Sequence, residues 1–218
     1  MNISYFGNKE SKTVLVQMVD EHDLSIIENE VEKIRELSHR DDFLLVAVKV
    51  DEWNKDLSPW RAPAVFGEYD FGDGAKYALE FLQNYVISPL AKKDEESGNK
   101  TKFYIGGYSL AGLFALWAAY ETNVFSGVAA ASPSVWFDGF CDFAKANDIK
   151  AGRVYLSLGD KEEKTKNQTM SKVGDAIRTL YSHLSKKVRC RLEWNEGGHF
   201  KDADVRTAKA FAWLLDSN

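Results

Sequence analysis

A serine lies between a short apolar run and a longer one, in the sequence Gly107-Tyr108-Ser109-Leu110-Ala111. This pattern is a version of the G-x-S-x-G nucleophile elbow, a sharp turn between a strand and a helix that exposes the serine hydroxyl. The positions two before and two after the serine come close together in such a turn, and Gly107 and Ala111 are both small. The pattern predicts that Ser109 is a nucleophile and that the N–H of Leu110 binds an oxyanion. The alternative is a glycine-rich turn with an incidental serine.

A nucleophilic serine needs a general base, and the histidines differ in their settings. His199 follows Gly197 and Gly198, which let a loop bend back toward a sheet edge, and it comes after Ser109 in the chain. We therefore expect His199 to be the base, against the alternative of a loop histidine beside a glycine turn. The other histidines fall at helix ends or on a helix, where a surface position is expected: His22, His39 and His183.

A base histidine also needs a carboxylate that orients its ring and stabilises the imidazolium. Three acids follow the segment 153–158, namely Asp160, Glu162 and Glu163. Each lies near the end of a predicted strand, and spacing alone does not choose among them.

These side chains must be positioned by alternating strands and helices. Apolar runs predict strands at 13–19, 43–50, 102–107, 125–131, 153–158 and 188–194. Amphipathic or apolar periodicity predicts helices at 24–37, 75–90, 110–121, 137–147, 169–184 and 202–215. Residues 51–73 and 92–102 are expected to be loops. Such alternation predicts a mostly parallel sheet covered by helices on both faces, with functional residues at the carboxyl ends of its strands.

Composition restricts the class of protein. The chain has 218 residues, 44% hydrophobic and 28% charged, and a net charge of -5, which suit a single domain over residues 1–218 and argue against a nucleic-acid partner. Two cysteines, Cys141 and Cys190, do not make a disulfide framework. No signal peptide or membrane span is predicted, so we expect a cytoplasmic protein. No metal or cofactor is expected, because the histidines are scattered.

The chain resembles the putative-esterase family of α/β-hydrolases, which includes siderophore-ester hydrolases, S-formylglutathione hydrolases, feruloyl and acetyl-xylan esterases, and mycolyltransferases. The resemblance covers about residue 43 to the C-terminus and is carried by residues 107–112, 131–136, 155–162 and 197–199. It implies an α/β-hydrolase fold; the chain departs from the family in being short, so we expect a minimal, lidless version of that fold. It also implies Glu162 as the acid, because that acid usually falls three residues after the glycine ending its strand; Asp160 is the second choice. One departure is Ala111, where many relatives have glycine.

The loop after residues 43–50 is expected to supply the second oxyanion donor, the N–H of Glu52 or Trp53. Aromatic residues near the predicted site are expected to line a substrate pocket, although a core position is an equal alternative for the tryptophans: Trp53, Trp60, Trp136 and Tyr108.

The function predicted is hydrolysis of a small carboxylic ester through an acyl-enzyme on a Ser109-Glu162-His199 triad. Activity should then rise with pH through the histidine range, about 6.5 for an ordinary imidazole. The alternatives are a thioesterase, an amidase or an acyltransferase on the same triad, and a non-catalytic binding protein on a hydrolase fold. Neither the ester nor the oligomeric state is predicted.

Overall fold

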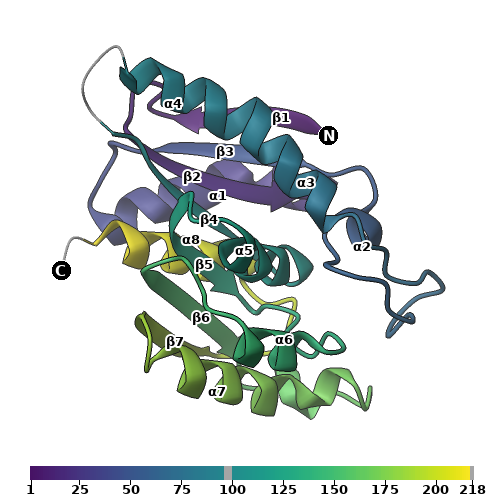
Figure 1. The fold of residues 1–218 in the computed structure, drawn as a ribbon. Coiled ribbons are helices and arrows are strands. Elements are labelled where there is room, and N and C mark those ends of the chain that lie inside the picture. The colour runs from purple at the N-terminus through teal and green to yellow at the C-terminus, as the bar shows by residue number, and fades with distance from the viewer. Residues whose placement is uncertain (96–99, 217–218) are drawn as a thin grey trace.

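The computed structural model describes residues 1–95 and 100–216 of the chain, and these residues form one seven-stranded sheet (Figure 1). The order across the sheet is β1-β3-β2-β4-β5-β6-β7. The edge strand β1 is antiparallel to β3, and all other neighbours are parallel. The strands are β1 (Asn2–Gly7), β2 (Thr13–Val19), β3 (Leu44–Lys49), β4 (Lys102–Tyr108), β5 (Phe125–Ala131), β6 (Arg153–Gly159) and β7 (Arg189–Asn195).

Helices cover both faces of the sheet, as the strand-helix alternation predicts. In Figure 1, α1 and α8 lie behind the sheet and α5 lies in front of it. The helices are α1 (Glu21–Ser38), α2 (Trp53–Asp56), α3 (Ala75–Leu82), α4 (Ser88–Glu95), α5 (Leu110–Glu121), α6 (Phe140–Ala146), α7 (Val173–Leu184) and α8 (Ala203–Leu215). None of the described helices is both long enough and apolar enough to cross a bilayer.

Two hydrophobic cores hold these layers together, one on each face. The core under α1 and α8 includes Ile34 and Phe211, packed with Leu45 of β3. The larger core contains α5, whose residues from Leu110 to Tyr120 are all buried. Burying apolar surface is the main stabilising contribution to such a fold, and it explains why α5 carries almost no polar side chain.

The structure differs from the sequence-based expectations in several places. The strand β1 was not predicted, because its residues are mostly half-buried or exposed and carry little apolar signal. The helix predicted at 75–90 contains a π-helical turn, Gln83–Ile87, and continues into α4. Pro89 lies just beyond this turn and has no N–H to donate to the preceding turn. The loop predicted at 92–102 is wrong for its first residues, because α4 extends to Glu95. Residues 96–99 of that predicted loop lie outside the described part of the chain.

Three further elements differ from the predicted ranges. The predicted loop 51–73 contains the short helix α2. The helix α6 begins at Phe140, three residues later than predicted. The helix α7 begins at Val173, because the preceding Met170–Lys172 segment winds as a tighter 3-10 turn.

Candidate active site

The predicted site residues gather at one edge of the sheet, because the carboxyl ends of neighbouring parallel strands meet there. Ser109 follows β4, Glu162 follows β6 and His199 follows β7. Ser132 follows β5, the strand between β4 and β6. Four neighbouring strands therefore deliver side chains to one place.

Ser109 lies on a strained turn between β4 and α5. Its φ of 56° and ψ of −120° are unusual for a residue with a side chain. A Cβ on Gly107 would lie 2.7 Å from the Cβ of Ala111, so this turn needs a glycine at 107 and a small residue at 111. The steric prediction for these two positions is confirmed. The N–H of Ser109 donates to the carbonyl of Ala131, 3.1 Å away, which ties the turn to β5.

Ser109, His199 and Glu162 form a continuous chain of hydrogen bonds. The Oγ of Ser109 lies 3.0 Å from Nε2 of His199, and Nδ1 of His199 lies 2.7 Å from Oε2 of Glu162. Because an ionised carboxylate only accepts, Nδ1 carries the proton and Nε2 is left to accept from the serine hydroxyl. The Glu162 side chain is 4% exposed and that of His199 21% exposed. The imidazole is thus reachable from solvent, and its carboxylate partner is not.

The second oxygen of Glu162 is held by several donors. Its Oε1 accepts from the N–H of Gly159 at 2.7 Å, from the hydroxyl of Ser132 at 2.8 Å and from Nη1 of Arg206 at 3.0 Å. Burial alone would raise the pKa of Glu162, but its hydrogen bonds to His199, Gly159 and Ser132 lower that pKa below its ordinary value. This carboxylate is therefore ionised at neutral pH.

The other two acids that the sequence left open do different work. Oδ1 of Asp160 accepts from the N–H of Gly197 at 2.7 Å, which holds the loop before His199. Glu163 pairs with Arg178 on α7, 2.9 Å away. Of the three acids, Glu162 is the one that the structure brings to the histidine ring.

Tyr108, expected in a substrate pocket, is buried beside the histidine loop. Its hydroxyl donates to the carbonyl of His199 at 2.6 Å and accepts from Nη1 of Arg206 at 3.1 Å. Burial raises the pKa of Tyr108 to about 12, so the hydroxyl keeps the proton that it donates. A direct contact between Tyr108 and substrate stays a prediction.

The expected oxyanion donors differ in how they are engaged. The N–H groups of Leu110 and Trp53 have no acceptor among the described residues, and each begins a helix. The N–H of Glu52, in contrast, donates to Oδ2 of Asp56 at 3.0 Å. Of the two expected partners for Leu110, Trp53 has the available N–H.

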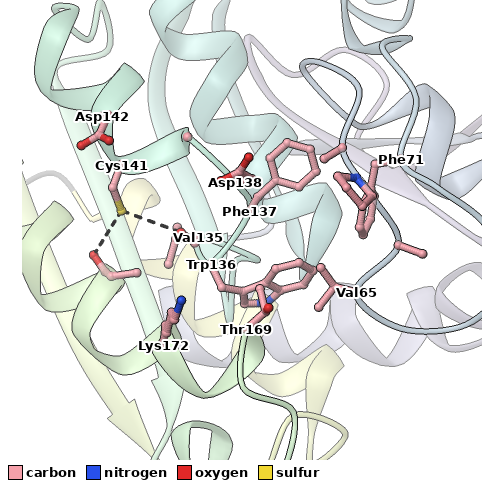
Figure 2. Close-up of a pocket in the computed structure, with 15 residues that line it drawn as sticks. Val65, Phe71, Val135, Trp136, Phe137, Asp138, Cys141, Asp142, Thr169 and Lys172 are labelled. Carbon is pink, nitrogen blue, oxygen red and sulfur yellow. Dashed lines mark hydrogen bonds between the residues drawn. The ribbon is translucent and has the colours of Figure 1, made fainter.

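A pocket of about 460 Å³ lies near the site (Figure 2), and Ser109, His199 and Glu162 are not among the residues that line it. Its wall at Val135 and Trp136 directly follows Ser134, whose Oγ is 3.3 Å from Oγ of Ser109. Phe71 packs against Trp136 in the same lining, with the two ring centroids 6.0 Å apart. The remaining lining is mostly apolar with a few charged groups, including Val65, Phe137, Asp138, Asp142, Thr169 and Lys172.

Only one of the expected pocket residues, Trp136, lines this cavity. Trp60 packs behind it, with Nε1 donating to the carbonyl of Asp138 at 2.9 Å and its ring against Phe137 and Phe143. Trp53 lines a separate hollow with Tyr69. For Trp60, the core alternative describes its surroundings better.

Sequence reasoning missed three residues of the site: Ser132, Ser134 and Arg206. The two serines had a signal, because they follow a predicted strand at its carboxyl end, where functional residues are expected. Arg206 had none, since an arginine on an amphipathic helix is usually solvated, yet it is 2% exposed. In the described part of the chain, no three His, Cys, Asp or Glu side chains gather as a metal would need.

Comparisons with known proteins bear on this geometry. No curated protein sequence matches the chain. Among solved structures, it is similar to an IroE-like serine hydrolase from Shewanella oneidensis, with a TM-score of 0.75 and 14% identity over 98% of this chain and 75% of that one. It is also similar to the siderophore hydrolase EstA from Aspergillus nidulans, with a TM-score of 0.67 and 19% identity over 98% of this chain and 94% of that one.

The carboxylesterase of Bacillus cereus gives a TM-score of 0.60 and 13% identity over 99% of this chain and 95% of that one. At such identities the likeness shows the α/β-hydrolase fold. The family comparison goes further, because the model described as "Putative esterase" matches residues 24–201. The chain therefore belongs to the putative esterase family, and it is an ester hydrolase.

Proposed function

We propose that Ser109, His199 and Glu162 are a catalytic triad through which the enzyme hydrolyses carboxylic esters by way of an acyl-enzyme. The observation that carries the proposal is the hydrogen-bonded chain from Oγ of Ser109 through His199 to the buried Glu162, with distances of 3.0 and 2.7 Å. Nucleophile, base and orienting carboxylate then have the geometry that acyl transfer requires.

In the first half of the reaction, Nε2 of His199 takes the hydroxyl proton while Oγ of Ser109 attacks the ester carbonyl. The oxyanion is stabilised by the N–H of Leu110 and, as second donor, that of Trp53. Collapse of the tetrahedral intermediate breaks the bond to the alcohol, which leaves with the proton from His199. In the second half, His199 takes a proton from water as the water attacks the acyl-enzyme. The second tetrahedral intermediate then breaks its bond to Oγ of Ser109, which takes the proton back from His199, and the acid is released.

For the substrate, we propose a small ester with an aromatic group on its acyl or alcohol side. Trp136 and Phe71 form an aromatic surface in the pocket whose wall follows Ser134, and a flat ring packs well against such a surface. Two of the similar structures are described as an IroE-like serine hydrolase and a siderophore hydrolase, which supports a small-molecule ester in general. Thioester or amide hydrolysis and transfer to another acceptor use the same triad and remain alternatives for the substrate panel below.

The first test is labelling with a fluorophosphonate probe together with hydrolysis of a short-chain p-nitrophenyl ester. The wild type should label and turn over, and Ser109→Ala should lose the label and at least about 10³-fold in kcat. The matched control is Ser126→Ala, which removes an exposed hydroxyl from β5 and should behave as wild type. A folded wild type that neither labels nor hydrolyses would favour the non-catalytic binding protein.

The same preparations test the substrate class. Aromatic and aliphatic acyl esters of one alcohol, with the matching thioester and anilide, are compared by kcat/KM. The aromatic ester should be preferred, and a higher kcat/KM for the thioester or anilide would replace the ester assignment. The cytoplasmic location also stays a proposal, which fractionation of cells of the source organism would test.

A further inference from the structure

Arg206 is a buried charge at the triad that the mechanism above does not use. It is the fourth residue of α8 and is 2% exposed. A guanidinium is always charged in proteins, and a buried charge is retained only where it is paired and hydrogen-bonded. The groups that pair with it therefore indicate its role.

One side of the guanidinium faces the triad acid. Nη1 donates to Oε1 of Glu162 at 3.0 Å, and to the hydroxyls of Tyr108 and Ser132 at 3.1 and 3.3 Å. The other oxygen of the same carboxylate bonds His199. Glu162 thus bridges a permanent cation and the imidazole.

The other side of the guanidinium holds the chain that leads into the histidine. Nη2 donates to the carbonyl of Glu196 at 3.0 Å and to that of Gly198 at 3.1 Å. The space is tight, because a Cβ on Gly159 would lie 2.3 Å from the carbonyl oxygen of Gly197 and 3.0 Å from Nη1 of Arg206. The Arg206 guanidinium therefore holds both the Glu162 carboxylate and the loop before His199 through hydrogen bonds from α8.

We propose that Arg206 is a positioning residue for the base His199, acting through Glu162 and the Glu196–Gly198 segment, and that its charge keeps the enzyme active down to lower pH. The inference rests on the proposed triad. The positive guanidinium offsets part of the carboxylate charge that would otherwise favour the imidazolium. The triad thereby keeps its orienting acid while the histidine remains a usable base.

The pH profile of activity also depends on the other charged and titratable groups around His199. These are Glu162 and Asp160 from the turn after β6, Tyr108 from β4, Arg206 from α8, and the exposed Glu196–Lys201 pair on its own loop. Only Arg206 is changed in the test, so these groups are constant between the variants.

The test is the pH profile of kcat/KM for a short-chain ester, measured for wild type, Arg206→Gln and Arg206→Lys. Arg206→Gln removes the positive charge, so the acidic limb should move up by about half to one pH unit. Arg206→Lys keeps the charge but not the two-sided fork. It should keep the wild-type midpoint and lose about 10-fold in kcat at unchanged KM, because misplaced catalytic groups slow the chemical step.

The matched control is Arg153→Gln, which removes another arginine that donates to backbone carbonyls, Trp213 and Leu214 at the far end of α8. Its midpoint and kcat should equal those of wild type. An unchanged midpoint in a folded Arg206→Gln variant, with the same fractional loss at every pH, would reduce Arg206 to a structural role and overturn the proposal.

If Arg206→Gln does not fold, Arg206→Lys decides alone: wild-type kcat there would overturn the positioning role, and a shifted midpoint would overturn the electrostatic one. Failure of the proposed triad can be told apart from failure of the Arg206 inference. A folded wild type without esterase activity, or an active Ser109→Ala, would end the proposed function and this inference together, whereas an active wild type with the wrong Arg206 profile ends only the latter.

Discussion

Both oxygens of the Glu162 carboxylate are occupied in the site. One orients His199, and the other accepts three hydrogen bonds that keep the group ionised. Asp160, only two residues away, holds the histidine loop through a backbone N–H. Two neighbouring acids therefore divide the orienting and loop-holding tasks, and substitution by the matching amide separates them.

We expect Glu162→Gln to lower kcat by roughly 10³–10⁴-fold, because an amide does not hold the histidine in the required tautomer. Asp160→Asn is the control, since its carbonyl still accepts from Gly197, and it should cost less than about 10-fold. Steady-state kinetics with a p-nitrophenyl ester measures both. The reverse order of effects would make Asp160 the triad acid.

At the scale of elements, close packing in the turn between β4 and α5 fixes the conformation of Ser109, the proposed nucleophile. The positive φ of Ser109 is tolerated because the surrounding strand and helix are buried and tightly packed. The closest approach is between positions 107 and 111, where there is no space for a second methyl group. A substitution that disturbs the packing of this turn should therefore lower both the stability and the esterase activity of the protein.

Gly107→Ala should destabilise the protein by about 1–3 kcal/mol and remove most activity, because the new methyl group overpacks the elbow. Adding Ala111→Gly removes the nearest clashing atom and should restore part of the stability. Gly152→Ala is the control, because the nearest atom to its Cβ is 3.9 Å away. Chemical denaturation and ester hydrolysis give the two readouts, and full activity in the single variant would contradict this account of the turn.

At the scale of the molecule, the two faces of the sheet are covered differently. The larger core, on one face, includes the helix α5 and part of the lining of the pocket. The smaller face, under α1 and α8, contains a buried carboxyl: Glu30 of α1 is 3% exposed and accepts from Nε2 of Gln17 at 3.2 Å. Burial raises the pKa of Glu30 well above its ordinary value.

A raised carboxyl pKa means that the folded protein holds a proton that the unfolded chain has already lost. Stability from Glu30 is therefore full below the ordinary pKa of about 4.3 and falls as pH rises toward the folded-state pKa. Glu30→Gln should gain on the order of 1 kcal/mol over wild type near pH 8, and no such gain near pH 4. Urea unfolding at both values measures this.

Glu28→Gln is the control on the same helix, because Glu28 is exposed and its replacement should change stability little at either pH. An equal difference between Glu30→Gln and wild type at pH 4 and pH 8 would mean that Glu30 does not titrate in the folded protein as described.

Much of the fold follows from local pattern. The strand at 125–131 and the helix at 110–121 have the predicted bounds, because unbroken apolar runs between turn residues mark buried elements clearly. The edge strand β1 escaped prediction, because it has one strand neighbour in the described sheet and its residues, all exposed or half-buried, form no continuous apolar run. The π-helical turn before α4 was missed because one extra residue in a helix changes the spacing of apolar residues too little to be seen in the sequence.

Local patterns in the sequence are enough to predict the chemistry of the site. A serine between small residues at a strand-to-helix turn and a histidine after two glycines are local patterns, and their order along the chain is that of an α/β-hydrolase. It takes the three-dimensional packing to show which acid meets His199, that Tyr108 faces the histidine loop, and that Arg206 is buried among them. These pairings join residues 37 to 98 positions apart, and they depend on strand order and helix packing, which no local pattern encodes.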